Sequence, residues 1–128
     1  MGKYGMTAVK AANLLQQGRV DSPPEAWRSA AHTVFPDSMS SQQKGCPRDT
    51  FLGLCQEGLV RGIPRGKYTR SELNKEYGLT AIALLRHESA LAKDARQLWR
   101  RVVGAGKKVH NQQMDVVISL WEDDLIKK

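Results

Sequence analysis

Cations gather around Tyr68 in a short stretch between residues 55 and 77 that contains several glycines. Arginine and lysine bind phosphate and carboxylate oxygens, and glycine lets the backbone approach a ligand closely. A helix predicted to begin near residue 70 would add free amide groups and the positive end of its dipole, which both favour an anion. The stretch therefore predicts an anion- or ligand-binding site made of Arg61, Arg65, Lys67, Tyr68, Arg70, Asn74 and Lys75.

A structural interpretation of the same stretch stays open. Gly62, Pro64 and Gly66 can shape a rigid connector, Ile63 can enter the core, and the cations can simply face solvent. Tyr68 would distinguish the two cases, because it could stack on a base or donate a hydrogen bond to a phosphate.

A second group of cations lies on the helix predicted over residues 89–103 and in the loop behind it. Residues 93, 96 and 100 recur at a spacing of three and four, so they share one helix face, and this helix contains one acid, Asp94. Such a face is typical of phosphate contact, although every amphipathic helix presents some polar face. The predicted nucleic-acid-binding residues are Lys93, Arg96, Arg100, Arg101, Lys107 and Lys108.

Catalytic and metal-binding patterns are weak. The run from Gly104 to Lys108 lacks the preceding strand, the glycine spacing and the Ser or Thr of a phosphate-binding loop, so nucleotide hydrolysis is excluded. His32, His87 and His110 have no metal-ligand spacing. Cys46 begins a predicted helix, whose dipole could lower the pKa of its thiol. We predict no catalytic residue, no metal and no cofactor, and do not expect an enzyme.

The hydrophobic periodicity is that of helices, and alternating β-branched residues are scarce. It predicts an all-α fold, a single compact domain of five to six helices over residues 1–128. The expected helices cover residues 7–17, 23–34, 47–57, 70–86, 89–103 and 111–126, with a polar loop at 37–44.

Local signals predict how the central helices end and begin. Gly58 supplies a left-handed stop for the helix over 47–57, in which Cys55 is expected to be a buried small hydrophobe. Thr69 and Glu72 have the spacing of a capping box at the start of the next helix. That helix is expected to bury Leu73, Tyr77, Ala81, Leu84 and Leu85.

Composition narrows the class of protein further. Hydrophobic residues make up 41% and charged residues 26%, as in an ordinary globular domain. No segment approaches the roughly 20 apolar residues of a membrane span, and the first residues lack the features of an export signal. Two cysteines without an export signal indicate free thiols in a reducing cytoplasm.

The net charge of +7 is concentrated in the middle of the chain. Seven cations face four acids in residues 44–77, and seven face two in residues 78–109. An excess of this kind favours polyanionic partners, nucleic acid first.

The run GLCQEGLVRGIPRGKYT, followed by SELNKEY and later by HNQQMDVVISLWEDDLI, resembles a small uncharacterised bacterial protein family. The resemblance covers about residues 5–126. It implies a bacterial, cytoplasmic protein, and it assigns no activity and no catalytic residue.

Three functional interpretations follow. The first is a helical module that binds nucleic acid or another phosphate-bearing ligand through the 61–71 loop and the basic face of helix 93–101. The second is a module that binds an acidic protein or forms a homodimer. The third is a small ligand-binding protein or enzyme with a pocket at the glycine loop.

Overall fold

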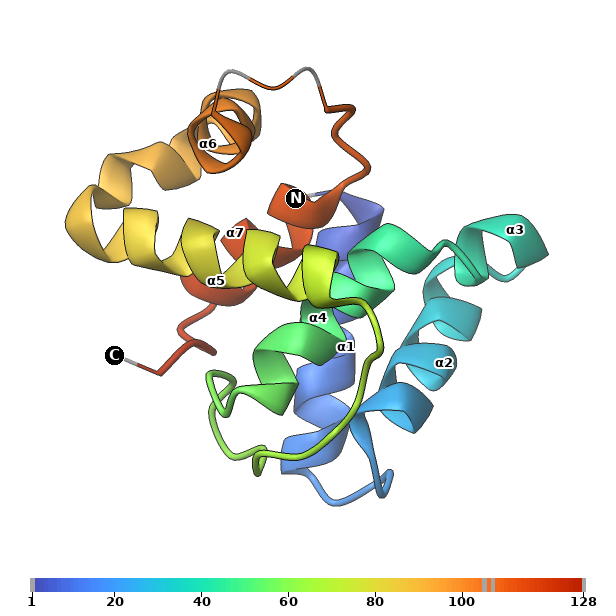
Figure 1. The fold of residues 1–128 in the computed structure, drawn as a ribbon. Helices are drawn as coiled ribbons and strands as arrows, with labels where there is room; N and C mark the ends of the chain where they lie inside the picture. Colours follow the sequence, from blue (N-terminus) through green and yellow to red (C-terminus); the bar gives the residue numbers. More distant parts are fainter. Residues whose placement is uncertain (1, 105, 107, 128) are drawn as a thin grey trace.

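A computed structural model describes residues 2–104, 106 and 108–127, which fold into a single compact all-α domain (Figure 1). This confirms the predicted fold class. The helices are α1 (Lys3–Gln16), α2 (Pro23–Val34), α3 (Met39–Gln42), α4 (Gly45–Gln56), α5 (Glu72–His87), η1 (Ser89–Lys93, a 3-10 helix), α6 (Ala95–Val103) and α7 (Gln113–Glu122).

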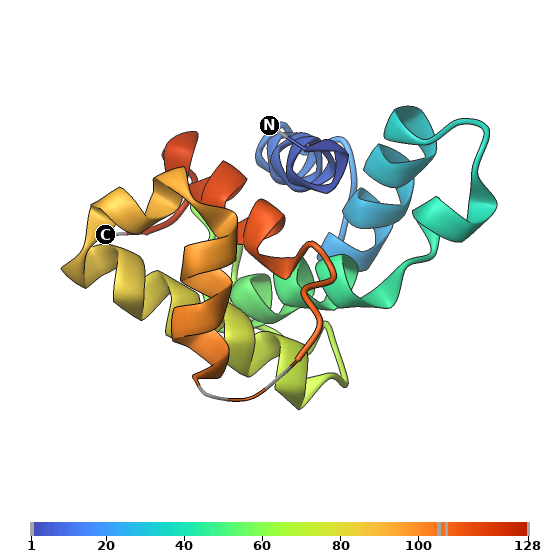
Figure 2. The ribbon, with the colours of Figure 1, turned by 90° about the horizontal axis from the view of Figure 1, so that it is seen from above.

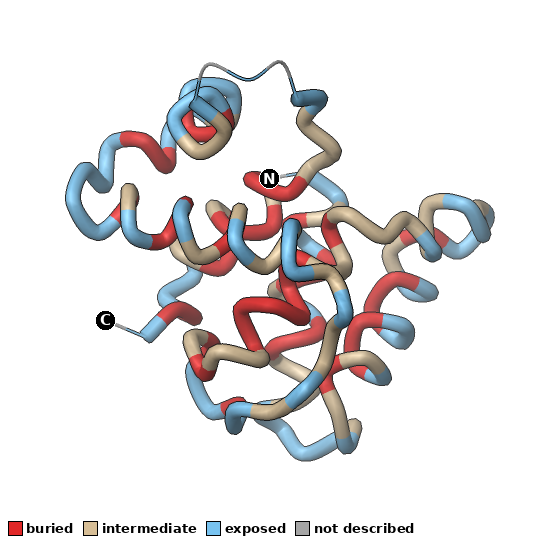
Figure 3. Tube along the Cα trace, viewed as in Figure 1, coloured by how far each residue is buried: buried red, intermediate tan, exposed pale blue. Residues whose placement is uncertain are grey.

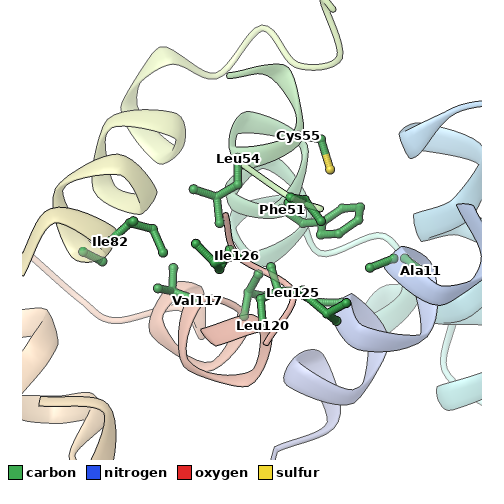
Figure 4. Close-up of a cluster of buried hydrophobic side chains, with 14 of the residues drawn as sticks. Ala11, Phe51, Leu54, Cys55, Ile82, Val117, Leu120, Leu125 and Ile126 are labelled. Carbon is green, nitrogen blue, oxygen red and sulfur yellow. The ribbon is translucent and has the colours of Figure 1, made fainter. Parts of the chain in front are cut away.

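Helix α4 lies at the centre of the core. Its residues Phe51, Leu54 and Cys55 are fully buried, and the centroids of the Phe51 and Trp27 rings lie 5.5 Å apart. Figure 4 shows these side chains gathered with Val117 of α7 and with residues of the C-terminal segment. Burial raises the pKa of the Cys55 thiol strongly, so this cysteine is a core hydrophobe, as predicted.

Helices α1, α2, α5 and α7 contact α4, whereas α6 and η1 pack on α5 and α7, and α3 contacts α2. Helices α1 and α2 pack together, α5 and α7 pack against α4, and α6 crosses α5 (Figure 2). The buried positions follow the inner sides of these helices, whereas α3 and the connecting loops are mostly exposed (Figure 3).

The helix predicted over residues 89–103 is divided. Its first part is the 3-10 helix η1, and α6 begins only after Asp94, whose backbone is extended, so Lys93 does not lie on the same helix as Arg96 and Arg100.

Two helix ends also differ from the predictions. Helix α1 begins at Lys3, four residues before the expected start. Helix α7 ends at Glu122 and not at Ile126, because Asp124 adopts a left-handed φ of 59° and turns the chain away. The last residues then pair with the segment behind α4: Ile126 forms an isolated antiparallel bridge with Val60.

Glycine allows α4 and α5 to approach each other closely. A Cβ added at Gly53 of α4 would lie 2.7 Å from the Cα and the Cβ of Lys75 in α5. At Gly78 the nearest atoms are side-chain atoms of Leu54 and Thr50, at 3.1 and 3.3 Å. Gly78 was expected to mark close helix packing; the tighter contact is at Gly53.

No helix in the described part of the chain is both long and apolar enough to cross a membrane.

Candidate anion-binding surfaces

The segment of residues 58–71 connects α4 to α5 and is held to the end of α4. Gly58 ends α4 with a φ of +73°, as predicted. Gln56, which the sequence did not single out, then holds the segment in place. Its side-chain oxygen accepts hydrogen bonds from the backbone N–H groups of Tyr68 (2.9 Å) and Thr69 (3.2 Å), and its carbonyl accepts one from Gly66 (3.4 Å). A glutamine at a helix end has no sequence pattern that would predict this role.

The start of α5 corrects the predicted capping box. The N-cap is Ser71, whose hydroxyl accepts a hydrogen bond from the backbone N–H of Asn74. Thr69 instead donates to Asp49 of α4 at 3.0 Å and accepts from the Ser71 N–H at 3.1 Å. The helix begins later because Asp49 holds Thr69 against α4. Leu73, predicted to be buried, is 54% exposed.

Three of the predicted ligand-binding residues bind other protein groups. Arg61 pairs with Asp124 at 3.4 Å. Lys75 pairs with Glu72 at 3.1 Å and with Glu57 at 3.2 Å, and hydrogen bonds to these carboxylates raise its pKa. The Asn74 side chain donates to the hydroxyl of Ser71 and accepts from Gln113 at 3.2 Å.

Arg65 and Tyr68 shape the 58–71 segment itself. The Tyr68 hydroxyl donates to the carbonyl of Pro64 at 2.8 Å, and its ring lies against Gly66. The Arg65 side chain lies over Gly58, where an added Cβ would be 2.8 Å from the Arg65 Cγ.

Lys67 and Arg70 are the remaining cations of the predicted site. They are exposed, and among the described residues neither has a carboxylate within 4 Å. A small open cavity of about 460 Å³ lies between them and is also lined by Gln56, Tyr68, Thr69 and Glu72. Asn74 does not line this cavity, so the structure divides the predicted site.

Helix α6 presents its cations differently. Its N-cap is Asp94, whose carboxylate accepts a hydrogen bond from the Gln97 N–H at 3.1 Å. Leu98 and Trp99 are buried against the rest of the domain. The exposed cations on and beside the helix are Lys93, Arg96, Arg100, Arg101 and Lys108, which we call the α6 basic face.

Most of the α6 basic face has no ionic partner. Arg101 pairs loosely with Glu88 at 3.7 Å. In the described part of the chain, the side chains of Lys93, Arg96 and Arg100 have no carboxylate within 4 Å. Lys107, which we also predicted to bind nucleic acid, lies outside the described residues.

The packing behind α6 depends on a histidine. His110 accepts a hydrogen bond from the Met114 backbone N–H at 3.0 Å, in the first turn of α7. Its ring centroid lies 5.2 Å from that of Trp99, whose indole N–H donates to the carbonyl of Lys108. Burial lowers the pKa of His110, so the neutral imidazole that this hydrogen bond needs is favoured.

The 61–66 part of the first predicted region lies far from α6. In Figure 1 α6 is at the top of the domain and the 61–66 loop is at the bottom, with α5 and α4 between them. One compact ligand therefore does not contact both α6 and this loop.

Comparison with known proteins places the chain in a family. A family model described as "Family of unknown function (DUF6979)" matches residues 1–127, so the chain belongs to this family. This confirms the resemblance to an uncharacterised family. Neither the curated proteins nor the solved structures contain a match to the chain.

Proposed function

We propose that this protein binds nucleic acid through the α6 basic face. The observation that carries the proposal is the set of three exposed cations, Lys93, Arg96 and Arg100, which have no carboxylate within 4 Å among the described residues. Cations that no carboxylate neutralises are free to bind phosphates and to release the counterions that surround them.

The chemistry of the face indicates binding to the phosphate backbone. Arg96 and Arg100 lie one helical turn apart, so their Cα atoms are separated by about 6 Å along the helix axis. Guanidinium groups at this spacing can contact neighbouring phosphates of one strand. Gln97, which follows Arg96 in the same helix, is also exposed, and its side-chain amide can form hydrogen bonds with a ligand there. Phosphate contacts orient a protein on a nucleic acid without reading its sequence, so we expect weak sequence preference.

The test is fluorescence anisotropy with a labelled 20-nucleotide RNA and a labelled 20-base-pair DNA, titrated at several salt concentrations. We expect the R96A/R100A variant to bind at least tenfold more weakly at low salt. The slope of log K against log salt should become shallower by roughly 1.5 to 2. The matched control is K10A/R19A, which removes two exposed cations outside the α6 basic face.

Two results would contradict the proposal. One is the absence of binding by the wild-type protein at low salt. The other is an equal loss of affinity in R96A/R100A and K10A/R19A, which would show that only the net charge matters.

The 61–71 loop is a second candidate for phosphate contact, supported by the free side chains of Lys67 and Arg70 beside one cavity. The K67A variant tests it in the same titration. Loss of affinity in K67A, with the affinity of R96A/R100A unchanged, would place the binding site at the loop.

The proposed setting for either site is the bacterial cytoplasm, where nucleic acid is accessible and the Cys46 and Cys55 thiols stay reduced.

A further inference from the structure

A long open groove runs beside α2 and meets the predicted ligand-binding site at Tyr68 and Arg70. Its volume is about 1370 Å³, and it lies between α2, the α3 turn, the start of α4 and residues 68–71. The residues of α2 that line it extend from Pro24 to Thr33. Nine residue steps of an α-helix correspond to about 13 Å, so the groove is elongated.

Three arginines from three separate elements line this groove: Arg28 of α2, Arg48 of α4 and Arg70 before α5. Arg28 and Arg70 are exposed, and in the described chain neither has a carboxylate within 4 Å. Arg48 has one acidic neighbour, the adjacent Asp49, and the contact is long, at 3.4 Å.

The two acids of the groove are engaged with other groups. Asp49 accepts the hydrogen bond from Thr69 at 3.0 Å in addition to its contact with Arg48. Glu25 lies in the first turn of α2, and its carboxylate accepts from the backbone N–H of Asp21 at 3.4 Å. Three arginines against these two acids leave a net formal charge of +1 along the groove, and neither acid lies within 4 Å of Arg28 or Arg70.

Apolar side chains lie among these charges. Trp27 and Leu52 are buried beneath the groove, and Tyr68 contributes one edge. Met39 of α3 lies at the groove with its side chain largely in solvent, at 63% exposure. An exposed methionine is a flexible, polarizable contact for an apolar side chain of a partner.

We propose that this groove binds an extended acidic peptide segment of a partner protein, with carboxylates on the arginines and an apolar side chain against Met39 and Leu52. An extended chain rises about 3.3 Å per residue, so about four residues fill the groove. A small molecule fits less well, because sites for small molecules are usually closed and of about 300 to 1,000 Å³. Arginine forks bind carboxylates in bidentate pairs, which orient the peptide.

The groove is independent of the proposed nucleic-acid site. Helices α2 and α3 lie at the opposite end of the domain from α6 in both Figure 1 and Figure 2. Failure of the α6 proposal therefore leaves the groove proposal standing, and the two are tested with different variants of the same protein. The second candidate, the 61–71 loop, shares Arg70 with the groove, and K67A tests it without changing a residue that lines the groove.

The experiment is selection of peptides from a phage-displayed library of random linear 12-mers on the immobilised wild-type protein. Individual selected peptides are then synthesised with a fluorescent label, and their affinities are measured by anisotropy. We expect the selected peptides to be enriched in Asp and Glu and to share an apolar residue. We expect the R28A/R70A variant to bind them at least tenfold more weakly.

Control variants separate the groove from general charge. R96A/R100A and K10A/R19A each lose two cations outside the groove and should bind the selected peptides as the wild type does. M39A should weaken binding by several-fold and leave the charge unchanged. Circular dichroism melting establishes that each variant is folded.

Three outcomes would overturn the proposal. The selected peptides could lack acidic enrichment, or they could bind R28A/R70A and the wild type equally. Millimolar inorganic phosphate could also displace them completely at constant ionic strength, which would identify a site for small anions and not for a peptide.

Discussion

The 57–75 region and the α6 basic face each hold five cations, yet folding brings more carboxylates to the first than to the second. Around the first region, carboxylates from other elements reach the cations: Asp124 pairs with Arg61 and Glu57 with Lys75. At α6 the one acid of the helix, Asp94, caps its N-terminus. The first region therefore uses two of its five cations, Arg61 and Lys75, to hold the structure, whereas among the described residues the α6 basic face has one paired cation, Arg101.

The difference shows that the density of charge along a sequence does not identify a binding surface. A cation paired within the protein must lose its partner before it can bind a ligand, whereas a solvated cation loses only water and counterions. The predictions below test this division, beginning with the region that is expected to be structural.

The largest effect is expected where the first region meets the core. In the G53A variant the new methyl group would collide with the backbone of Lys75, which a change of rotamer cannot relieve. We expect a loss of about 2 to 3 kcal/mol in the free energy of unfolding, measured by urea denaturation. The matched control is G78A. There the atoms nearest to the new methyl group are side-chain atoms of Leu54 and Thr50, which can move, and the gain of about 1 kcal/mol in helix propensity offsets the cost of the close contact. Equal destabilisation by both changes would contradict the assignment.

A smaller loss of stability is expected when the hydrogen bonds that hold the 58–71 segment to α4 are removed. The Q56A variant leaves the N–H groups of Tyr68 and Thr69 without their acceptor, at a cost of about 1 to 2 kcal/mol. Q97A, an exposed glutamine of α6, is the control and should change stability by less than about 0.5 kcal/mol. Hydrogen exchange should show faster exchange of the two released amides. Unchanged exchange at Tyr68 and Thr69 would mean that Gln56 does not hold the segment.

The packing of His110 against Trp99 of α6 should make the stability of the protein depend on pH. Because burial lowers the pKa of His110 in the folded state, the unfolded chain takes up this proton first, near its ordinary pKa of about 6.5. The contribution of neutral His110 to the free energy of unfolding is therefore complete above about pH 6.5, and it falls as the pH is lowered below that value. We expect the free energy of unfolding to fall between pH 7 and pH 5, and H110N to reduce this dependence. An equal pH dependence in H110N would assign the effect to other groups.

The smallest effect contrasts one cation from each region directly. K75M should lower the Tm by a few degrees at pH 7, whereas R96M should leave it unchanged, because only Lys75 is paired. The pKa of Lys75 is raised in the folded state, so its contribution is complete below the ordinary value of about 10.5. This contribution is lost as the pH rises through the raised pKa of Lys75 in the folded protein. The difference in Tm between K75M and the wild type should therefore shrink at that pH. An equal decrease of Tm in R96M and K75M would contradict the expectation that the paired cation contributes more to stability than the unpaired one.

Much of the fold could be predicted because its signals are local. The repeat of apolar residues every three to four positions depends only on the geometry of a helix, so helices lie at all the expected places. The one expected over residues 89–103 is divided at Asp94 into η1 and α6. Gly58 ends α4 as predicted, because the left-handed conformation favours glycine wherever it occurs. Burial of Cys55 followed from its place on the apolar side of that helix.

The errors lie where distant residues compete with local signals. Thr69 and Glu72 have the spacing of a capping box, but Asp49, twenty positions earlier, accepts the hydrogen bond of the threonine hydroxyl. The apolar pattern of α7 continues to Ile126, but the helix ends at Glu122 and the last residues pair with Val60.

The sequence by itself determined the class of fold, the approximate course of each helix and the excess of positive charge, because these depend on composition and on neighbours within one or two turns. Only the tertiary structure decided which cations are neutralised, since Arg61 and its partner Asp124 are 63 positions apart. It also decided that Arg28, Arg48 and Arg70 line one groove. Both results depend on which helices pack side by side, and that arrangement is set by the shared core around α4.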